Sequence, residues 1–307
     1  MELFFRLVLG GVGNGAVYAS VALALVLIFR TTGLLNLAQG EMALFSTYFT
    51  WKLTDLGLGI AAAIVVSVVA SMVAGALIER FLIRPIDAPG KSPLNVLIVM
   101  LGLFLALNAL AQLAFSTDAE PMPKAWPSVG SPGSLVGDSA TLTTLGDIRI
   151  SWSVVALGLA LTAECLLLYV LFQKTRVGLM LRAVASNSDS ARLVGIRSSA
   201  MLMLGWALAA GLGALAGSLV AANGGSVNPG LMAVVLVYAF SAAALGGFDS
   251  PVGAVVGGMI VAIAEALTTG YVDALETIEL AVPFGLILIV LLVRPTGLFG
   301  RKVVERV

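Results

Sequence analysis

The sequence predicts an all-α polytopic membrane protein, and three observations lead to this fold class. Of the 307 residues, 59% are hydrophobic and only 11% are charged, whereas soluble domains carry about 25% charged residues. Several apolar stretches reach about 20 residues, the length that a helix needs to cross a bilayer. The alternating apolar and polar pattern of membrane β-barrels is absent. Because lipid offers no hydrogen-bond partners to the backbone, helices are the expected spanning elements.

Nine membrane segments are predicted, and residues 1–307 are expected to form a single transmembrane domain. Five segments have the length of a full crossing, at about 7–29, 58–79, 94–115, 152–173 and 201–222. Four are shorter or interrupted, at about 34–52, 231–246, 252–269 and 280–294. Some of the shorter segments are expected to be broken or re-entrant.

The charged residues of the connections predict the orientation, since cytoplasmic loops are enriched in Lys and Arg. Basic residues gather in three regions: Arg80, Arg84 and Lys91; the five Lys and Arg of 174–197; and Arg294, Arg301, Lys302 and Arg306. The connections 116–150 and 270–279 are mainly acidic. We therefore expect a cytoplasmic C-terminus and an N-terminus on the outer side. The formal net charge of zero argues against nucleic-acid binding.

The extracytoplasmic loop 116–150 is rich in Pro, Gly, Ser and Thr. Its prolines at 121, 123, 127 and 132 exclude a continuous helix. Two interpretations are equally open. The loop either lies over the outer mouth of a pathway or forms an exposed linker.

Two stretches interrupt the apolar pattern with glycine and polar residues: TTGLLNLAQGEM at 31–42 and GGFDSPVGAVVGG at 246–258. Such breaks persist at membrane depth only where protein or a water-filled cavity covers the freed backbone groups. One break lies in each half of the chain, which is the arrangement of transporters built from inverted repeats around a central pathway. The two halves share no clear sequence identity, so the inverted repeat is a hypothesis.

Polar side chains at the breaks and in the first segment are candidates for lining a substrate pathway. They are Asn14, Tyr18, Asn36, Gln39, Glu41 and Asp249. Asn14 and Tyr18 are four residues apart, so they share one face of a helix. Polar groups inside a membrane tend to face a cavity, but they also hydrogen-bond neighbouring helices without touching substrate. We favour the pathway for the cluster Asn36, Gln39 and Glu41, and interhelical hydrogen bonding for each residue taken singly.

Glu164 and Glu265 are acidic residues inside predicted spans, where a charge costs about 2.5–3.5 kcal/mol. They indicate either an ion or proton site or a structural partner, and the structural interpretation is favoured because no intramembrane Lys or Arg accompanies them. The chain contains no histidine and a single cysteine, Cys165. It therefore offers neither an intrachain disulfide nor histidine-based metal or acid–base chemistry, and we predict no catalytic or metal site.

The connection 174–197 carries five of the seventeen basic residues and precedes 51 residues, Ser198 to Phe248, without a charge. Ser188 is the expected N-cap of a short helix, and Gly195 is the expected residue that ends it. The helix would lie on the membrane surface or insert into a groove on a cytosolic protein. No G-x-x-x-x-G-K-[ST] nucleotide-binding loop occurs in the chain, so any ATPase must be a separate subunit.

Four segments resemble the permeases of bacterial branched-chain amino acid ABC importers of the LivH type. They are NGAVYASVALALVLIFRTTGLLNLAQGEM (14–42), VGLMLRAVASNSDSARLVGI (177–196), AFSAAALGGFDSPVGAVVGGMIVAIAE (239–265) and LVRPTGLFG (292–300). The resemblance implies a bacterial inner-membrane protein that works by alternating access. It implies that Arg182, Asp189, Arg192 and Gly195 belong to the segment that contacts an ATPase, and that the Asn36–Glu41 break lies near the translocation route.

The same resemblance implies the partners: a second related permease of the LivM type or a second copy, two ATP-binding subunits that hold ATP and Mg²⁺, and an extracytoplasmic solute-binding protein. No cofactor is expected in this chain. Family members more often have His where Gln39 stands, so a proton role is not expected at that position. The alternative function is an ion-coupled secondary transporter that uses Glu164 or Glu265.

Overall fold

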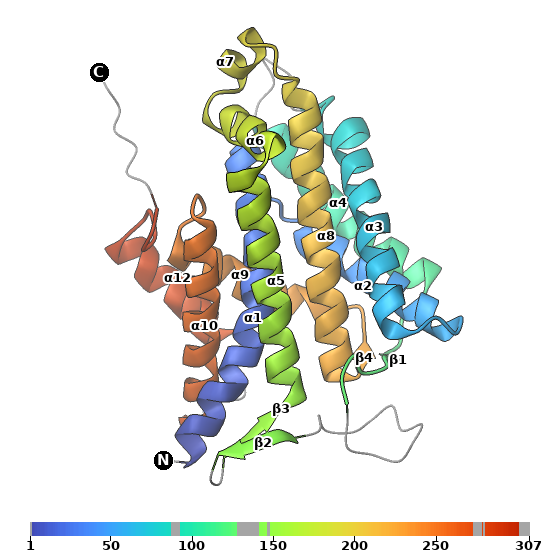
Figure 1. Cartoon of the computed structure of the whole chain (residues 1–307), viewed down its shortest axis with the longest axis vertical. Helices are drawn as coiled ribbons and strands as arrows, with labels where there is room; N and C mark the ends of the chain where they lie inside the picture. The colour runs from blue at the N-terminus through green and yellow to red at the C-terminus, as the bar shows by residue number, and fades with distance from the viewer. Residues whose placement is uncertain are drawn as a thin grey trace.

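Long helices packed side by side make up the computed structural model, which describes residues 2–86, 93–127, 141–145, 148–272, 278 and 280–300 (Figure 1). Each predicted membrane segment coincides with a helix: α1 (Glu2–Thr32), α2 (Gln39–Asp55), α3 (Ile60–Ile78), α4 (Pro93–Ala114), α5 (Trp152–Lys174), α8 (Ser198–Gly224), α9 (Leu231–Gly246), α10 (Pro251–Tyr271) and α12 (Ala281–Val293). The remaining elements are the π-helix η1 (Glu79–Ile83), α6 (Arg176–Ser186), α7 (Ser188–Leu193), and strands β1 (Glu120–Pro121), β2 (Thr141–Leu145), β3 (Ile148–Ser151) and β4 (Ser226–Val227).

Six helices in the described ranges are long and apolar enough to cross a membrane: α1, α3 continued by η1, α4, α5, α8 and α10. Helices α9 and α12 are apolar but shorter, and α2 has 17 residues. The chain is therefore an all-α multi-pass membrane protein, as the sequence predicts. The number of complete crossings and the inverted repeat stay predictions.

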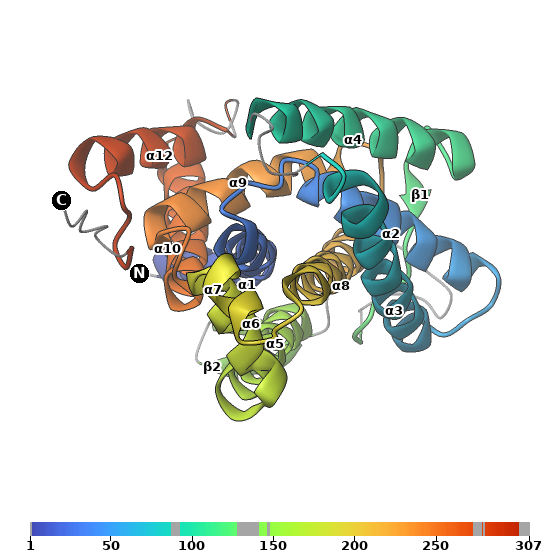
Figure 2. The same cartoon turned by 90° about the horizontal axis from the view of Figure 1, so that it is seen from above.

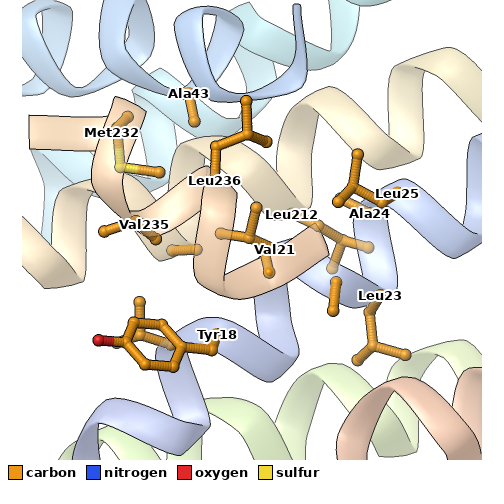
Figure 3. Close-up of a cluster of buried hydrophobic side chains, with 14 of the residues drawn as sticks. Tyr18, Val21, Leu23, Ala24, Leu25, Ala43, Leu212, Met232, Val235 and Leu236 are labelled. Carbon is orange, nitrogen blue, oxygen red and sulfur yellow. The ribbon is translucent and has the colours of Figure 1, made fainter. Parts of the chain in front are cut away.

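Helix α1 lies at the centre of the bundle, where α5, α8, α9 and α10 contact it (Figure 2). Every residue from Gly15 to Ile28 is buried. Figure 3 shows the apolar side chains that fill this centre, among them Val21 of α1, Leu212 of α8 and Leu236 of α9. The outer helices instead expose large apolar side chains, such as Leu105 of α4, which suit a lipid surface.

Glycines allow the helices α9 and α10 to cross with their backbones in contact. A Cβ atom on Gly257 of α10 would overlap the carbonyl oxygen of Ala242 in α9, and one on Gly253 would overlap that of Gly246. On the other side of α10, a Cβ on Gly258 would lie 2.7 Å from the backbone nitrogen of Ala19 in α1. Small residues at such crossings are typical of membrane helix packing.

Both predicted helix breaks are confirmed. Helix α1 ends at Thr32, Gly33 has a φ of +72°, and α2 begins at Gln39. The second break separates α9 from α10, with Ser250 as N-cap accepting a hydrogen bond from Gly253 N–H at 3.0 Å. The C-terminal segment covers this break, because the N–H groups of Leu298 and Phe299 donate to the carbonyls of Leu245 and Gly246 at 2.8 and 3.0 Å.

Helices α6 and α7 lie at one end of the bundle, and five of the described basic residues belong to these two helices or flank them: Lys174, Arg176, Arg182, Arg192 and Arg197 (Figure 1). Arg6 and Arg149, near the start of α1 and in β3, belong to the opposite end. Arg84 Nη2 donates to the carbonyl of Ser199, at the start of α8, at 2.9 Å. The segment that begins with Arg294 reaches the same end through its bonds to the end of α9. The N-terminus lies at the opposite end, beside β2 and β3 (Figure 1). The orientation of the bundle relative to the membrane stays a prediction, and Lys91, residues 273–277 and 279, and residues 301–307 lie outside the described residues.

The first part of the loop 116–150 is packed against the end of α8. Strands β1 and β4 pair antiparallel, with Glu120 opposite Val227, and Met122 N–H donates to the Gly225 carbonyl at 2.9 Å. Met122 and Trp126 are buried. Residues 120–126 are therefore anchored to the bundle through Met122 and Trp126, although Pro121 and Ala125 are exposed. Both interpretations of the loop stay predictions, and residues 128–140 lie outside the described part of the chain.

Candidate translocation and coupling sites

The first break is held in place by a buried amide network. Asn36 Oδ1 accepts from the N–H of Ala38 at 3.0 Å, and Asn36 Nδ2 donates to Gln39 Oε1 at 3.1 Å. Gln39 Nε2 in turn donates to the carbonyl of Ala209 in α8 at 3.0 Å. Both side chains are fully buried. The network therefore joins the start of α2 to α8 in the conformation described, and contact of these residues with substrate stays a prediction.

The carboxyl group of Glu41 points toward α4 rather than toward the two amides. Asn108 Nδ2 donates to Glu41 Oε2 at 2.9 Å and to the carbonyl of Pro229 at 3.2 Å. Gln112 Nε2 donates to Asn108 Oδ1 at 2.6 Å. Glu41 Oε1 is buried and has no hydrogen-bond partner among the described residues. Asn108 thus provides the hydrogen bond that accommodates a carboxyl group inside the bundle.

Replacing Asn108 with leucine is expected to destabilise the protein by about 1–3 kcal/mol, because Glu41 would lose its donor within the bundle. The thermal unfolding midpoint in detergent measures the effect. The matched control is Gln112→Leu, which removes a neighbouring amide but leaves the bond from Asn108 to Glu41 in place. Equal shifts in the two variants would show that Glu41 does not depend on Asn108.

Tyr18 and Glu265 join α1 to α10. The Tyr18 hydroxyl donates to Glu265 Oε2 at 2.9 Å, and the Tyr18 ring stacks on Tyr238 of α9 with centroids 4.6 Å apart and planes 2° apart. Asn14, which shares the predicted helix face with Tyr18, is exposed. These two contacts connect α1, α9 and α10, as expected if Glu265 is a structural hydrogen-bond partner.

Glu164 and Asp249 occupy different surroundings. Glu164 of α5 is only 4% exposed, and neither carboxyl oxygen has a hydrogen-bond partner in the described structure; Ser20 of α1 is the neighbouring polar side chain. Asp249 is half-buried in the turn between α9 and α10, at the end of the bundle that carries α6. Among the candidate pathway residues, Asn36 is bonded to Gln39, whereas Tyr18 and Glu41 are bonded to Glu265 and Asn108, which are not pathway candidates.

The predicted coupling segment folds as two short helices fixed to the bundle. Thr175 caps α6 by accepting from Gly178 N–H at 3.0 Å. Gly178 lets α6 approach the end of α5 closely, because a Cβ there would overlap the carbonyl oxygen of Leu171. Helix α7 is tied to α8 by the Ser198 hydroxyl, which donates to the Ser188 carbonyl at 3.2 Å.

The ends of α7 differ in part from the prediction. Asn187, not Ser188, is the N-cap, and its Oδ1 accepts from Ser190 N–H at 2.8 Å. Asparagine caps as well as serine does, and its extended backbone also ends α6. At the other end Gly195 has a φ of +84°. The N–H groups of Gly195 and Ile196 donate to the carbonyls of Arg192 and Ala191, both at 3.0 Å. These two bonds form a Schellman motif, so Gly195 ends the helix as predicted.

The tip of α7 is the most exposed apolar part of this segment. Leu193 is 89% exposed and Val194 is 76% exposed. Asp189 and Arg192 flank them with side chains 93% and 59% exposed, 4.0 Å apart. Arg182 lies apart from this tip, since its Nη1 donates to Gln173 of α5 at 3.3 Å.

A family model described as the permease component of the branched-chain amino acid transport system matches residues 7–291. The chain belongs to this permease family. Its relatives are transport subunits and not enzymes. The permease is 30% identical to the high-affinity branched-chain amino acid transport system permease protein LivH of Escherichia coli K12, over 99% of this chain and 98% of LivH.

A second relative, BraD of Pseudomonas aeruginosa, is named a high-affinity branched-chain amino acid transport system permease protein and is 29% identical over 99% of this chain and 98% of BraD. Among solved structures, PsaBC from Streptococcus pneumoniae in complex with Fab is 13% identical, with a TM-score of 0.47, over 96% of this chain and 93% of that chain. The resemblance found in the sequence is confirmed by the family model and by the relatives. The roles of the individual site residues stay predictions.

The sequence did not point to Asn108, Gln112 or Tyr238. Asn108 and Gln112 are four residues apart, so they form a polar pair on one face of an otherwise apolar helix. That spacing was the available signal. Tyr238 gives no comparable signal, because an isolated tyrosine in an apolar span does not identify its stacking partner.

Proposed function

We propose that this permease is the membrane subunit of an ATP-driven importer for branched-chain amino acids or related small polar solutes. The family match and the names of the relatives support the substrate class. ATP and Mg²⁺ would be bound by partner subunits, since the chain carries no Walker A loop. The permease would move solute across the membrane and would carry no cofactor of its own.

The proposed assembly contains a second permease subunit, either a related LivM-type chain or a second copy, together with two ATP-binding subunits. An extracytoplasmic binding protein would deliver the solute. The bacterial plasma membrane is the proposed location, with α6, α7 and the C-terminus in the cytoplasm. The five basic residues of the connection 174–197, which contains α6 and α7, support this orientation, because positive residues favour the cytoplasmic side.

One observation carries the coupling role: an exposed apolar tip at the end of a rigidly anchored helix pair. Leu193 and Val194 are far more exposed than such residues usually are outside lipid. The Schellman motif and the Asn187 cap fix the tip's conformation. An apolar tip flanked by Asp189 and Arg192 suits a groove on a soluble partner, which would bury the apolar side chains and pair the charged ones.

The anchors of the helix pair suggest how motion would reach the bundle. Helix α6 is attached to α5 through Gly178, and α7 is attached to α8 through Ser198. Helix α8 also provides the Ala209 carbonyl to which Gln39 is bonded. A partner that moved α7 would displace α8 and change the first break, and repacking of this kind would open the permease alternately to the two sides.

Replacing Leu193 with aspartate is expected to lower ATP-dependent uptake at least about tenfold, because a charged group would then enter the apolar contact with the ATPase. Uptake of radiolabelled leucine and co-purification of the ATPase measure the loss. Ser186→Asp adds the same charge at an exposed position on α6 and is expected to leave both unchanged. Normal uptake by the Leu193 variant would remove the α7 tip from the contact.

Reconstitution separates this function from the ion-coupled alternative. Proteoliposomes that contain the full set of subunits are expected to accumulate leucine only with internal ATP and the binding protein. Uptake by the permease alone, driven by a proton or sodium gradient without ATP, would overturn the importer assignment. It would favour a carrier that uses Glu164 or Glu265.

A further inference from the structure

A cavity of about 260 Å³ lies between α1, α5, α6 and α10. Apolar side chains form most of its wall: Leu23, Leu27, Leu168, Phe172, Leu181, Val252 and Val255. Its lining includes the last turns of α1 and α5 and the first residues of α10. Since three membrane helices end or begin there, the cavity lies at the depth where lipid headgroups meet acyl chains.

Two of the polar side chains that line this cavity carry positive charge. Arg30 and Arg182 line it together with Thr31 and Gln173, and no Asp or Glu is among its lining residues. Arg182 Nη1 donates to Gln173 Oε1 at 3.3 Å. Arg182 Nε is buried and has no hydrogen-bond partner within the described structure. A guanidinium with an unused buried donor beside an apolar hollow fits a ligand with an anionic head and an apolar tail.

We propose that this cavity binds one anionic phospholipid of the surrounding bilayer, with its phosphate on Arg182 and Arg30 and part of an acyl chain along Leu27, Leu168 and Phe172. Arginine binds phosphate oxygens with strong, charge-assisted hydrogen bonds. Basic pockets between membrane helices at the cytoplasmic side are suited to anionic headgroups. At this position, the headgroup and the acyl chain of one lipid from the cytoplasmic leaflet would reach the arginines and the apolar wall together.

The charge of the lining favours a lipid over the transported amino acid. A zwitterionic amino acid would place its carboxylate on arginine, but its ammonium group would need a carboxylate or a cluster of free acceptors. The lining residues include no acid that could neutralise an ammonium group. A buried ammonium without partners is costly. A phosphatidylglycerol headgroup carries one negative charge and no such cation.

A lipid in this position would contact the coupling helix. Leu181, Arg182 and Ala185 of α6 form one wall of the cavity, while α1, α5 and α10 form the others. The bound lipid would therefore fill the space between α6 and the membrane bundle. Removing it would loosen α6, so the membrane's content of anionic lipid would affect how firmly the coupling helix is seated.

Native mass spectrometry of the purified permease tests the proposal, with phosphatidylglycerol and phosphatidylcholine of equal chain length as probes. The first phosphatidylglycerol is expected to bind at least about fivefold more tightly than the first phosphatidylcholine. Arg182→Gln is expected to remove this preference. Arg176→Gln, which removes an exposed charge on the same helix but not from the cavity, is expected to retain it.

A second variant keeps the charge and fills the space. Ala185→Phe is expected to weaken phosphatidylglycerol binding about fivefold or more, because the ring would occupy the cavity while Arg182 remains. Glycerol 3-phosphate and L-leucine are expected not to displace the lipid. Equal losses in the Arg182 and Arg176 variants, no loss in the Ala185 variant, or displacement by either soluble compound would overturn the proposed lipid site. None of these results depends on transport, so the importer function stands or falls separately.

Discussion

Uptake is expected to fall about tenfold or more when Gly178 is replaced with alanine, although the change adds a single methyl group. The new Cβ would overlap the carbonyl oxygen of Leu171 and lie 2.5 Å from the Cα of Phe172, both in the backbone of α5. A side chain can relieve such an overlap by changing rotamer, but backbone atoms cannot, so α6 must shift. The shift would also lengthen the 3.0 Å bond from Gly178 N–H to Thr175 Oγ1 that caps α6.

The matched control is Gly158→Ala, in the neighbouring helix α5, where nothing lies within 4 Å of the added Cβ. The control is expected to retain full uptake and to gain slightly in helix stability. ATP-dependent uptake and ATPase stimulation should be measured together in the complete importer. A Gly178 variant that keeps normal uptake would show that the seating of α6 on α5 is not needed for coupling.

This sensitivity follows from the way α6 and α7 are attached. The close approach at Gly178 and the bond from Ser198 to Ser188 join the pair to α5 and α8. The exposed Leu193 lies beyond both attachments. A contact at the tip would therefore act on two long helices at once, and a fault at either attachment would weaken transmission without altering the tip itself.

Sequence was sufficient for the fold class and for the helix breaks because both depend on local composition. Gly33 and Pro251 mark the two interruptions directly, since glycine permits a left-handed backbone and proline favours the first turn of a helix. The cap of α7 was harder to place. Asn187 and Ser188 are both good capping residues, and only the backbone of Asn187, with φ of −158° and ψ of 104°, decides between them.

The partners of the candidate site residues were beyond the sequence because they are distant along the chain. The bonds from Gln39 to Ala209 and from Asn108 to Glu41 join residues 170 and 67 positions apart. Tyr18 and Glu265 are 247 positions apart. Spacing along one helix predicts which side chains share a face, but it does not predict which neighbouring helix that face meets.

The crossing of α9 and α10 leads to the other prediction with a large expected effect. Replacing Gly257 with alanine is expected to destabilise the permease by about 1–3 kcal/mol and to reduce its folded yield sharply. The added Cβ would overlap the Ala242 carbonyl oxygen of α9, so the two helices must separate. Lipid provides no hydrophobic force to restore contact between apolar helices, so close packing is their main source of attraction.

The thermal unfolding midpoint and the monodisperse fraction in mild detergent measure this loss. Gly285→Ala in α12 is the matched control, because no atom lies within 4 Å of its Cβ, and alanine favours a helix over glycine by about 0.8–1.0 kcal/mol. The two identical substitutions should therefore shift the midpoint in opposite directions. If Gly257→Ala behaved like the control, α9 and α10 would not depend on this backbone contact, and the second break would owe its position to the hydrogen bonds from Leu298 and Phe299 instead.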